Sequence, residues 1–329
     1  MVTLSADQLD GSVEEAEMEM LIVVVRYRLS LEHSVTFGSL SKAFMSHPDL
    51  LASIGVLIWD NGPSALPEVQ LPYPFEYQYT GRNLGVSAAY NCALALAEEK
   101  GCPWLLLLDQ DTTLPESFLS SMLEYARFHQ ANERIAAVAP FLICNSQPVS
   151  PAIIRMDHAQ PLPLSLSGEH ERPAYAANSG TLMRVSALRA VGGYDEDFWL
   201  DYSDIALFHR LYLNGMRLYI AGDLHLHHSL STNNYDVTMS PERYRNAIAA
   251  EGAYWDLYRS RRDNFALTVR LLLRAFKQWI VYRNKEFSRI TWRQFFRRIF
   301  ATKPQRLQHW RTQSGYRNIP AVASENSII

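Results

Sequence analysis

The sequence predicts an α/β fold with a mostly parallel central sheet, followed by a helical and basic C-terminal extension. Three apolar runs have the unbroken hydrophobicity of strands that are buried on both faces: residues 21–25, 54–59 and 104–108. Helix-compatible stretches at residues 39–45 and 87–100 separate these runs. Alternating strands and helices are typical of a parallel sheet covered by helices. From Pro241 to about Phe300 the pattern becomes helical, basic and aromatic.

The middle of the chain carries less regular signals. Residues 140–173 are rich in proline, serine and other polar residues, which favours an excursion of loops and irregular strands over the sheet. After it, helices are predicted at residues 187–193 and 204–214. Gly192 and Gly193 end the first helix, and Gly215 follows the second. Strands are predicted at residues 217–220 and 224–228.

The net charge of −3 conceals a strong asymmetry. Residues 259–317 hold 16 of the 31 basic residues and 2 of the 34 acidic ones (+14), which leaves 15 basic and 32 acidic residues (−17) elsewhere. The two parts therefore face different partners. These boundaries predict an acidic tail over residues 1–19, the α/β domain over residues 20–240, and a helical, basic region over residues 241–329.

The composition excludes several classes of protein. The 329 residues, 48% hydrophobic and 20% charged, suit a globular protein with a sizeable core. Cys92, Cys102 and Cys144 are odd in number and form no Cys-x-x-Cys pattern, so neither a disulfide framework nor a zinc knuckle is expected. The acidic N-terminus does not resemble a signal peptide, and no apolar run approaches the roughly 20 residues of a membrane-spanning helix. We expect a cytoplasmic protein.

Two carboxylates follow the third apolar run, in Asp109-Gln110-Asp111. The carboxyl end of a buried strand is where open α/β sheets bind ligands. Mn²⁺ and Mg²⁺ prefer one or two carboxylates together with phosphate oxygens, so Asp109 and Asp111 are candidate ligands for such an ion beside a diphosphate. The pattern alone is weak, because Asp195 and Asp197 repeat it; position after the strand separates the two copies.

Candidate nucleotide contacts follow the second strand and precede the second helix. Asp60 could accept the imide N–H of uracil or thymine, although Asp60-Asn61-Gly62 is also a plain turn pattern. Arg82 and Asn83 precede the helix at residues 87–100, whose N-terminus could favour phosphate. A capped turn explains that pattern equally well.

Candidate sugar and acceptor contacts lie further along the chain. Asn178, Ser179 and Gly180 combine small polar side chains with a flexible residue, which would let a sugar ring approach the backbone; the alternative is a turn. Trp199 and Asp201 place an aromatic ring beside a carboxylate, as acceptor-binding carbohydrate sites do. Asp201 and Asp204 are three residues apart and would share a helix face. One of them would cap the helix while the other accepts a proton, or both are caps.

Three histidines cluster near a predicted strand end. Strand alternation places His225 and His227 on one face and His228 on the other, so at most two of them converge. Imidazole is a competent ligand for Mn²⁺-type ions, and a structural role is the alternative.

The order of these motifs resembles glycosyltransferase family 2, in particular its rhamnosyltransferase-like branch. The matching segments span residues from about 21 to about 230, and they are residues 58–62, 83–85 with Asn91, 105–112, 178–181, 193–210 and 228–230. The chain departs from the family pattern at Arg28, where Asn usually follows the tyrosine, at Ala206 and at Ser231. The ordered set is far more specific than any one motif.

The resemblance implies a glycosyltransferase A-type fold, in which a single Rossmann-like domain binds the nucleotide. It also implies nucleotide-sugar contacts by Tyr27 and Asp60, a Mn²⁺ or Mg²⁺ ion held by Asp109 and Asp111, and Asp204 as catalytic base. The family's downstream metal-binding histidine matches His228 best, because Ser229 and Leu230 follow it, with His227 as second choice.

The resemblance further implies an inverting, metal-dependent transfer of a sugar, L-rhamnose from dTDP-rhamnose being the expected donor, onto a glycan or lipid-linked acceptor in bacterial surface polysaccharide synthesis. One alternative is the same fold with UDP-galactofuranose or a UDP-hexose. The other is a catalytically silent protein that binds a nucleotide sugar or a glycan.

The basic C-terminal region predicts an amphipathic surface. Arg270, Arg274 and Lys277 recur at helical spacing beside large apolar residues, and Arg289, Arg293 and Arg297 repeat the pattern. Such helices suit the headgroup layer of an anionic bilayer, on the inner face of the plasma membrane. The alternatives are a helix packed on the α/β domain and a dimer contact. Nucleic acid is not expected as a partner, because the rest of the chain is acidic and has no recognition motif.

Overall fold

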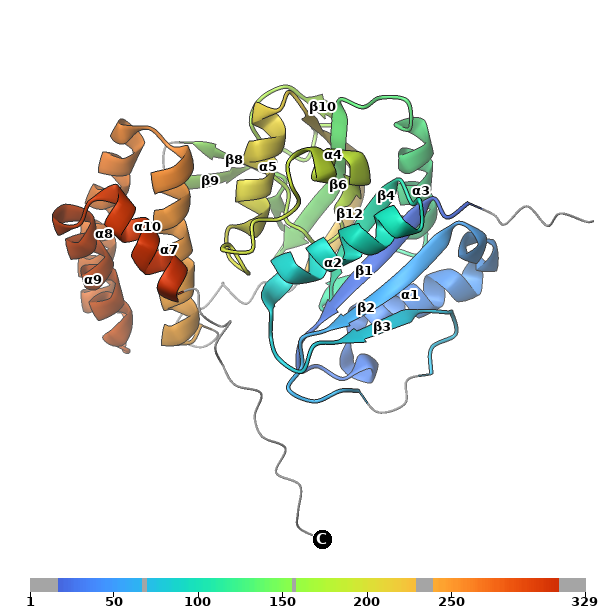
Figure 1. Ribbon diagram of the computed structural model, residues 1–329, viewed down its shortest axis with the longest axis horizontal. Coiled ribbons are helices and arrows are strands. Elements are labelled where there is room, and N and C mark those ends of the chain that lie inside the picture. Colours follow the sequence, from blue (N-terminus) through green and yellow to red (C-terminus); the bar gives the residue numbers. More distant parts are fainter. Residues whose placement is uncertain (1–16, 67–69, 156–157, 229–238, 314–329) are drawn as a thin grey trace, which may run out of the picture.

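A mixed ten-stranded sheet lies at the centre of the computed structural model, which describes residues 17–66, 70–155, 158–228 and 239–313 (Figure 1). The strand order is β10-β12-β6-β11-β4-β1-β2-β3, with β5 beside β12 and β7 beside β6. The strands are β1 Met20–Arg26, β2 Ile54–Asp60, β3 Glu76–Tyr79, β4 Trp104–Asp109, β5 Thr112–Thr113, β6 Ile135–Cys144, β7 Gln147–Ser150, β10 Gly168–His170, β11 Leu182–Arg184 and β12 Arg217–His228. A separate two-stranded sheet pairs β8 Ala152–Arg155 with β9 His158–Pro161.

The three predicted apolar strands are neighbours in this sheet. β1 lies between β2 and β4 and runs parallel to both, with Met20 opposite Ile54 on one side and Trp104 on the other. β11 runs antiparallel to β4 and β6, whereas β6 and β12 are parallel to each other. The predicted α/β class is therefore confirmed, but the sheet is mixed and not mostly parallel. The pairs β1–β2, β1–β4, β2–β3 and β6–β12 are parallel, and the other five pairs are antiparallel.

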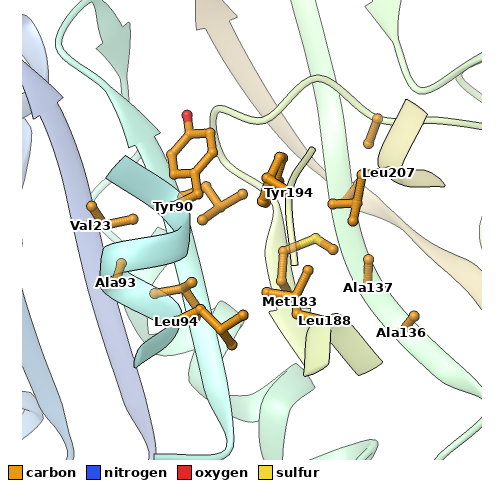
Figure 2. Packing of buried hydrophobic residues seen from close by; sticks show 14 of the residues in the cluster. Val23, Tyr90, Ala93, Leu94, Ala136, Ala137, Met183, Leu188, Tyr194 and Leu207 are labelled. Atoms are coloured by element: carbon orange, nitrogen blue, oxygen red, sulfur yellow. The ribbon is translucent and has the colours of Figure 1, made fainter. Parts of the chain in front are cut away.

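Helices cover both faces of the sheet. They are α1 Val35–Ser46, α2 Gly85–Glu99, α3 Phe118–Phe128, α4 Val185–Ala190 and α5 Ser203–Leu213, with short 3-10 turns at η1 Leu31–His33 and η2 Pro48–Ala52. Side chains alternate along each strand, so Val23 of β1 belongs to the core layer beneath α2, α4 and α5, while Ile22 belongs to the layer beneath α1 and α3. Figure 2 shows the first of these layers, in which Leu94 of α2 lies between Val23 on one side and Met183 and Leu188 on the other.

Two predictions about the middle of the chain were wrong in detail. The excursion expected to start at residue 140 begins later, because Pro140 lies within the fully buried strand β6 and only β7 to β10 form short, irregular strands. The two strands expected at residues 217–220 and 224–228 are one strand, β12, with an irregularity between Ala221 and His225. The buried neighbours of β6 outweigh its proline, which local pattern alone reads as a breaker.

The region after residue 240 is helical, as predicted; residues 239–313 contain four helices, which stand together beside α5 (Figure 1). They are α7 Pro241–Tyr258, α8 Arg261–Val281, α9 Glu286–Phe300 and α10 Lys303–Gln313. Ser240 caps α7, and Ser260 caps α8 in a reciprocal capping box with Asp263. These helices share a third apolar core with Phe198 and with residues of α5.

Along the described ranges, no helix combines the length and apolarity needed to cross a bilayer.

Candidate active site

The candidate site lies where the strand order reverses, between β1 and β4. Strand β2 pairs with one edge of β1, and β4, which comes later in the chain, pairs with the other edge. A crevice is therefore expected at the carboxyl ends of β1 and β4. The side chain of Gln110 bridges the segments that follow these strands. Its amide nitrogen Nε2 donates to the Tyr27 carbonyl (3.0 Å), and its Oε1 accepts from the Tyr27 N–H (2.8 Å). This bridge fixes the exposed Tyr27 beside the loop that carries Asp109 and Asp111.

Side chains at the N-terminus of helix α1 hydrogen-bond to the backbone of the same loop. Thr36 Oγ1 donates to the carbonyls of Asp109 (2.6 Å) and Thr112 (2.9 Å), and accepts from the Thr112 N–H (3.0 Å). Ser34 Oγ donates to the Gln110 carbonyl (2.5 Å). The sequence analysis gave no role to Ser34, Thr36 or Gln110. Polar residues at the start of a helix, such as Ser34 and Thr36, predict only a cap, and Gln110 has no pattern of its own between the two carboxylates. Their contacts preorganise the backbone around the two carboxylates.

The predicted Asn178-Ser179-Gly180 turn connects that loop to α5. Ser179 Oγ accepts from the Asp109 N–H (2.9 Å) and shares a hydrogen bond with Thr112 Oγ1 (2.7 Å). Asn178 Nδ2 donates to Ser203 Oγ (3.2 Å) at the start of α5. Asp109 and the first turn of α5 are therefore joined through two adjacent side chains.

Gly180 is required in this turn for steric reasons. Its φ of +83° is a conformation that favours glycine, and a Cβ there would lie 2.3 Å from Leu226 Cδ1. Its N–H donates to the Leu107 carbonyl (2.7 Å), which pins the turn to the end of β4.

Asp204 lies in the first turn of α5, beside the candidate metal-binding loop. Burial, together with the negative charges of Asp201 and Asp109, raises the pKa of its carboxyl from 3.8 to about 6, against a hydrogen bond of 2.8 Å from the Ile205 N–H. The interpretation of Asp201 and Asp204 as helix caps was wrong, since the N-cap of α5 is Tyr202 in a left-handed conformation (φ 64°) without a side-chain cap. A carboxyl with a pKa near 6 can exchange a proton near neutral pH.

Two buried tyrosines line the space between Asp109 and Asp204. Tyr90 of α2 and Tyr194 pack with ring centroids 5.0 Å apart, and both appear in Figure 2. Tyr90 OH approaches Asp109 Oδ1 (3.4 Å), and Tyr194 OH donates to Asn178 Oδ1 (2.9 Å). Burial and the charges of Asp109 and Asp204 raise the pKa of both phenols well above 10. Neither hydroxyl was assigned to the site from the sequence. Tyr194 lies within residues 193–210, which carry the family resemblance, whereas nothing local separates Tyr90 from an ordinary core tyrosine.

Asp60 lies at the same sheet edge, at the end of β2, but is fully buried. Its Oδ1 accepts from Arg26 Nη1 (2.6 Å) and the Gly62 N–H (2.7 Å), and its Oδ2 accepts from Tyr77 OH (2.6 Å). Burial together with this carboxylate raises the pKa of Tyr77 to about 12. The carboxylate is thus engaged within the protein, whereas the nearby Tyr27 is exposed.

The N-terminus of α2 is closed to phosphate in this structure, which corrects that expectation. The Trp199 carbonyl accepts from the N–H groups of Val86 (2.8 Å) and Ser87 (3.3 Å), so a capped turn is what the pattern forms. Asn83 Oδ1 accepts from the Gly85 N–H (2.9 Å), and Arg82 is exposed at the same edge of the sheet. The backbone of Trp199, which was expected to contact an acceptor, therefore serves as the cap of α2.

Asp201 points toward the C-terminal helices. Its Oδ1 accepts from Arg243 Nη2 of α7 (2.8 Å), and its Oδ2 is buried without a hydrogen-bond partner among the described residues. Burial raises the pKa of this carboxyl, and Arg243 opposes the shift. Asp201 joins the loop before Asp204 to the helical region.

The three histidines lie on β12, whose end pairs with β5. His227 is opposite Thr113 and His228 is opposite Thr112, one residue beyond Asp111. The alternation predicted for His225 and His227 is observed, since both are exposed between buried leucines. The side chain of His228 lies outside the described residues. In the part of the chain described, no group of three or more His, Cys, Asp or Glu residues is arranged to hold a metal ion.

Comparison with known families assigns the centre of the chain. Residues 54–146, from β2 to the end of β6, match the family described as Glycosyl transferase family 2. The chain is also 22% identical over 169 residues to the dTDP-rhamnosyl transferase RfbF of Shigella flexneri, an alignment that covers 48% of this chain and 53% of the relative. The chain therefore spans about half the length of this curated relative. The resemblance to this family that the motifs predicted is confirmed over residues 54–146.

Solved structures share the fold at low identity. TarS residues 1–349 of S. aureus superpose with a TM-score of 0.54 at 14% identity, over 90% of this chain and 88% of that chain. The same protein in complex with UDP-GlcNAc gives a TM-score of 0.52 with the same identity and coverage. GalNAc-T7 with UDP, GalNAc and Mn²⁺ gives 0.51 at 12% identity, over 90% and 59% of the two chains. The glycosyltransferase A-type fold is therefore confirmed.

Proposed function

We propose, from the match of residues 54–146 to glycosyltransferase family 2, that this chain transfers a sugar from a nucleotide diphosphate to an acceptor hydroxyl with inversion at the anomeric carbon. The observation that carries the proposal is the junction of Asp109, Ser179, Asn178 and Ser203, which brings the loop after β4 to the first turn of α5. A proton-accepting carboxyl and a cation-binding pair of carboxylates thereby belong to one site.

Asp204 is the general base in this proposal. Its carboxyl has a pKa of about 6, so it is ionised at neutral pH and can take the proton of an acceptor hydroxyl as that oxygen attacks the anomeric carbon. Because one displacement by the acceptor breaks the bond to the diphosphate, the configuration inverts. The neighbouring Tyr90 and Tyr194 keep their protons and can only donate hydrogen bonds or accept them through oxygen.

Asp109 and Asp111 would hold a Mn²⁺ or Mg²⁺ ion. Two carboxylates at a strand end fit these ions, which complete their coordination with phosphate oxygens and water. When bound, the ion would neutralise negative charge on the departing diphosphate. Ser34, Thr36 and Ser179 would support this role by fixing the loop backbone. His228, opposite Thr112 in the sheet, stays a candidate third protein ligand.

The donor is proposed to be dTDP-rhamnose, on the strength of the Shigella flexneri relative. UDP-galactofuranose or a UDP-hexose is the second candidate, because the fold is shared with solved structures that contain UDP-GlcNAc or UDP. Tyr27, Arg82 and Asn83 are proposed nucleotide contacts at the edge of the sheet. Asp60 would contact the pyrimidine only after its Oδ2 exchanges the bond with Tyr77.

The acceptor is proposed to be a glycan or a lipid-linked oligosaccharide of a bacterial surface polysaccharide, met at the cytoplasmic face of the membrane. We propose residues 20–240 as the catalytic domain, which includes Asp204, and the helices after residue 240 as a separate region. Asp201, held by Arg243, would act on acceptor binding through the position of the loop that it anchors.

A donor screen tests the proposal. dTDP-rhamnose, UDP-galactose, UDP-galactofuranose and GDP-mannose would be incubated with the full chain, with and without Mn²⁺ or Mg²⁺, and nucleotide release measured. We expect turnover of one donor, dependent on the ion and lost in Asp111→Asn. The matched control is Asp195→Asn in the second Asp-x-Asp copy, which should retain turnover. A chain that binds a donor yet releases no nucleotide with any ion would be a silent binding protein.

A further inference from the structure

An apolar face is exposed along α8 and α9. Ten large apolar side chains of the two helices are at least 41% exposed, and they are Phe265, Val269, Leu273, Phe276, Trp279, Ile280, Val281, Phe296, Ile299 and Phe300. In the rest of the described chain only six comparable side chains are that exposed or nearly so, and they are scattered over separate elements. Contiguous patches of this kind mark interaction surfaces rather than ordinary solvent-exposed surface.

Helix α8 has two apolar stripes, of which only one is used inside the protein. Leu267, Leu271 and Ala275 are buried and face α7 and α9. Phe265, Val269, Leu273, Phe276 and Ile280 recur at intervals of three or four residues on the other side of the helix. Only the buried stripe is used to pack α8 inside the protein. The exposed stripe is therefore available to contact something outside the described chain.

An aromatic ladder makes the face continuous between the two helices. Phe276 of α8 meets Trp292 of α9 edge to face, with ring centroids 5.0 Å apart. Trp292 stacks with Phe296 (5.5 Å), and Phe296 stacks with Phe300 (6.2 Å). The ladder orders these rings without removing them from solvent, because Phe300 is 80% exposed and Phe296 is 48% exposed.

The charge at this face is positive, although not where the sequence pattern suggested. Arg270 and Arg274 were expected to contact a bilayer, but both turn inward and pair with the buried Glu251. Arg298 likewise pairs with the buried Asp256, and Arg297 is half-buried. The basic residues that are exposed on α8, α9 and their connection are Arg261, Arg262, Lys277, Arg283, Lys285, Arg289 and Arg293. Both acidic residues of these helices, Asp263 and Glu286, lie in ion pairs with arginines.

We propose that the apolar face of α8 and α9 docks the protein on an anionic lipid bilayer, with its rings in the headgroup layer and the exposed arginines and lysines on the lipid phosphates. Aromatic and aliphatic side chains bordered by basic ones are what an interfacial helix presents to such a membrane. A second copy of the chain fits less well, because two such faces would bring their basic borders together. The docked face lies on helices that are joined to the active-site loop through α7 and α10, where Trp310 packs on Phe198 (4.6 Å).

The apolar half of the proposal is tested by flotation with vesicles of phosphatidylcholine and phosphatidylglycerol, without donor or acceptor. The double variant Phe276→Ser/Phe300→Ser should bind at least tenfold more weakly than the parent, because two rings lose their burial in the headgroup layer. The matched control is Phe128→Ser on α3, where the ring is 75% exposed. It should bind like the parent. Unchanged melting temperatures would show that both variants fold.

The electrostatic half is tested with Arg289→Glu/Arg293→Glu. Each basic residue near an anionic surface contributes roughly a fivefold gain in partitioning, so this variant should bind at least tenfold more weakly, and salt at about 0.5 M should weaken the parent similarly. Quenching of tryptophan fluorescence by lipid that is brominated near the headgroup end of its acyl chains, reduced in Trp279→Phe, would place this ring at the base of the headgroup layer.

Equal binding to vesicles of phosphatidylcholine alone would overturn the proposal, as would parental binding by the double phenylalanine variant. A concentration-dependent dimer in sedimentation velocity, lost in that variant while the parent ignores vesicles, would also overturn it and assign the face to a second copy. Because the vesicle assay needs no turnover, it fails independently of the proposed glycosyl transfer.

Discussion

Two regions of the protein bury carboxylates, and they treat the buried charge in opposite ways. In the helical region, Glu251 is buried between Arg270 and Arg274, and although burial alone would raise its pKa, the two guanidiniums lower it. At the candidate active site, burial raises the pKa of Asp204 to about 6, and its charged neighbours Asp201 and Asp109 are themselves carboxylates.

The difference shows that the neighbours of a buried carboxylate decide whether it keeps its charge or readily takes up a proton. A buried carboxylate between two arginines keeps its charge at all ordinary pH values and holds helices together. A buried carboxylate beside other carboxylates is strained in its charged form, and this strain makes it a good proton acceptor near neutral pH. Variants of Asp204 and Glu251 test this contrast.

The largest effect is expected for transfer by Asp204→Asn. An amide cannot take the acceptor proton, so turnover should fall by about 10² to 10⁴-fold, while donor binding is kept because the side chain retains its size. Nucleotide release and isothermal titration with the donor would measure the two quantities. Turnover within a few fold of the parent would remove Asp204 from the role of base.

A large loss of stability is expected for Glu251→Gln. The substitution leaves Arg270 and Arg274 in a buried site without their counter-charge, which should lower the free energy of unfolding by about 3 to 5 kcal/mol. Urea denaturation would measure it. Glu98→Gln is the control, because the exposed pair of Glu98 and Arg189 should contribute less than about 1 kcal/mol. Similar losses in both variants would mean that the Glu251 cluster is not held as described.

The opposite sign is expected for the stability of Asp204→Asn. Since the folded pKa of about 6 lies above the ordinary 3.8, the folded state favours the protonated carboxyl, and that stabilisation is lost as the pH rises through 6. The asparagine variant avoids the loss and should be more stable above pH 7, by up to about 3 kcal/mol. Thermal unfolding should show this advantage shrinking as the pH falls from 8 to 5. An advantage that is independent of pH would contradict the raised pKa.

The smallest effect concerns the pH profile of the parent. If Asp204 must be ionised to act, kcat/KM should fall about tenfold per pH unit below a pKa of about 6 and level off above it. The Asp195→Asn control should show the same limb. A profile that stays flat down to pH 5 would mean that no group with this pKa acts as the base in the free enzyme.

From the sequence alone, the α/β fold class, the resemblance to glycosyltransferase family 2 and the helical nature of the C-terminal region could be predicted. The unbroken apolar runs of β1, β2 and β4 predict buried parallel strands, because a strand that is covered on both faces is apolar at every position. Asp109, Asp111, Ser179 and Asp204 could be chosen because they stand in motifs at the ends of such elements. These features depend on neighbours in the chain, so a local pattern carries them.

Only the tertiary structure decided what each charged or polar side chain faces. Arg270 and Arg274 share the spacing of membrane-contacting arginines, yet they turn inward because Glu251 of another helix meets them there. The Trp199 carbonyl closes the N-terminus of α2 from more than one hundred residues away, and Tyr90 belongs to the site through Asp109. Burial and charge pairing arise between segments distant in sequence, and a local pattern holds no record of them.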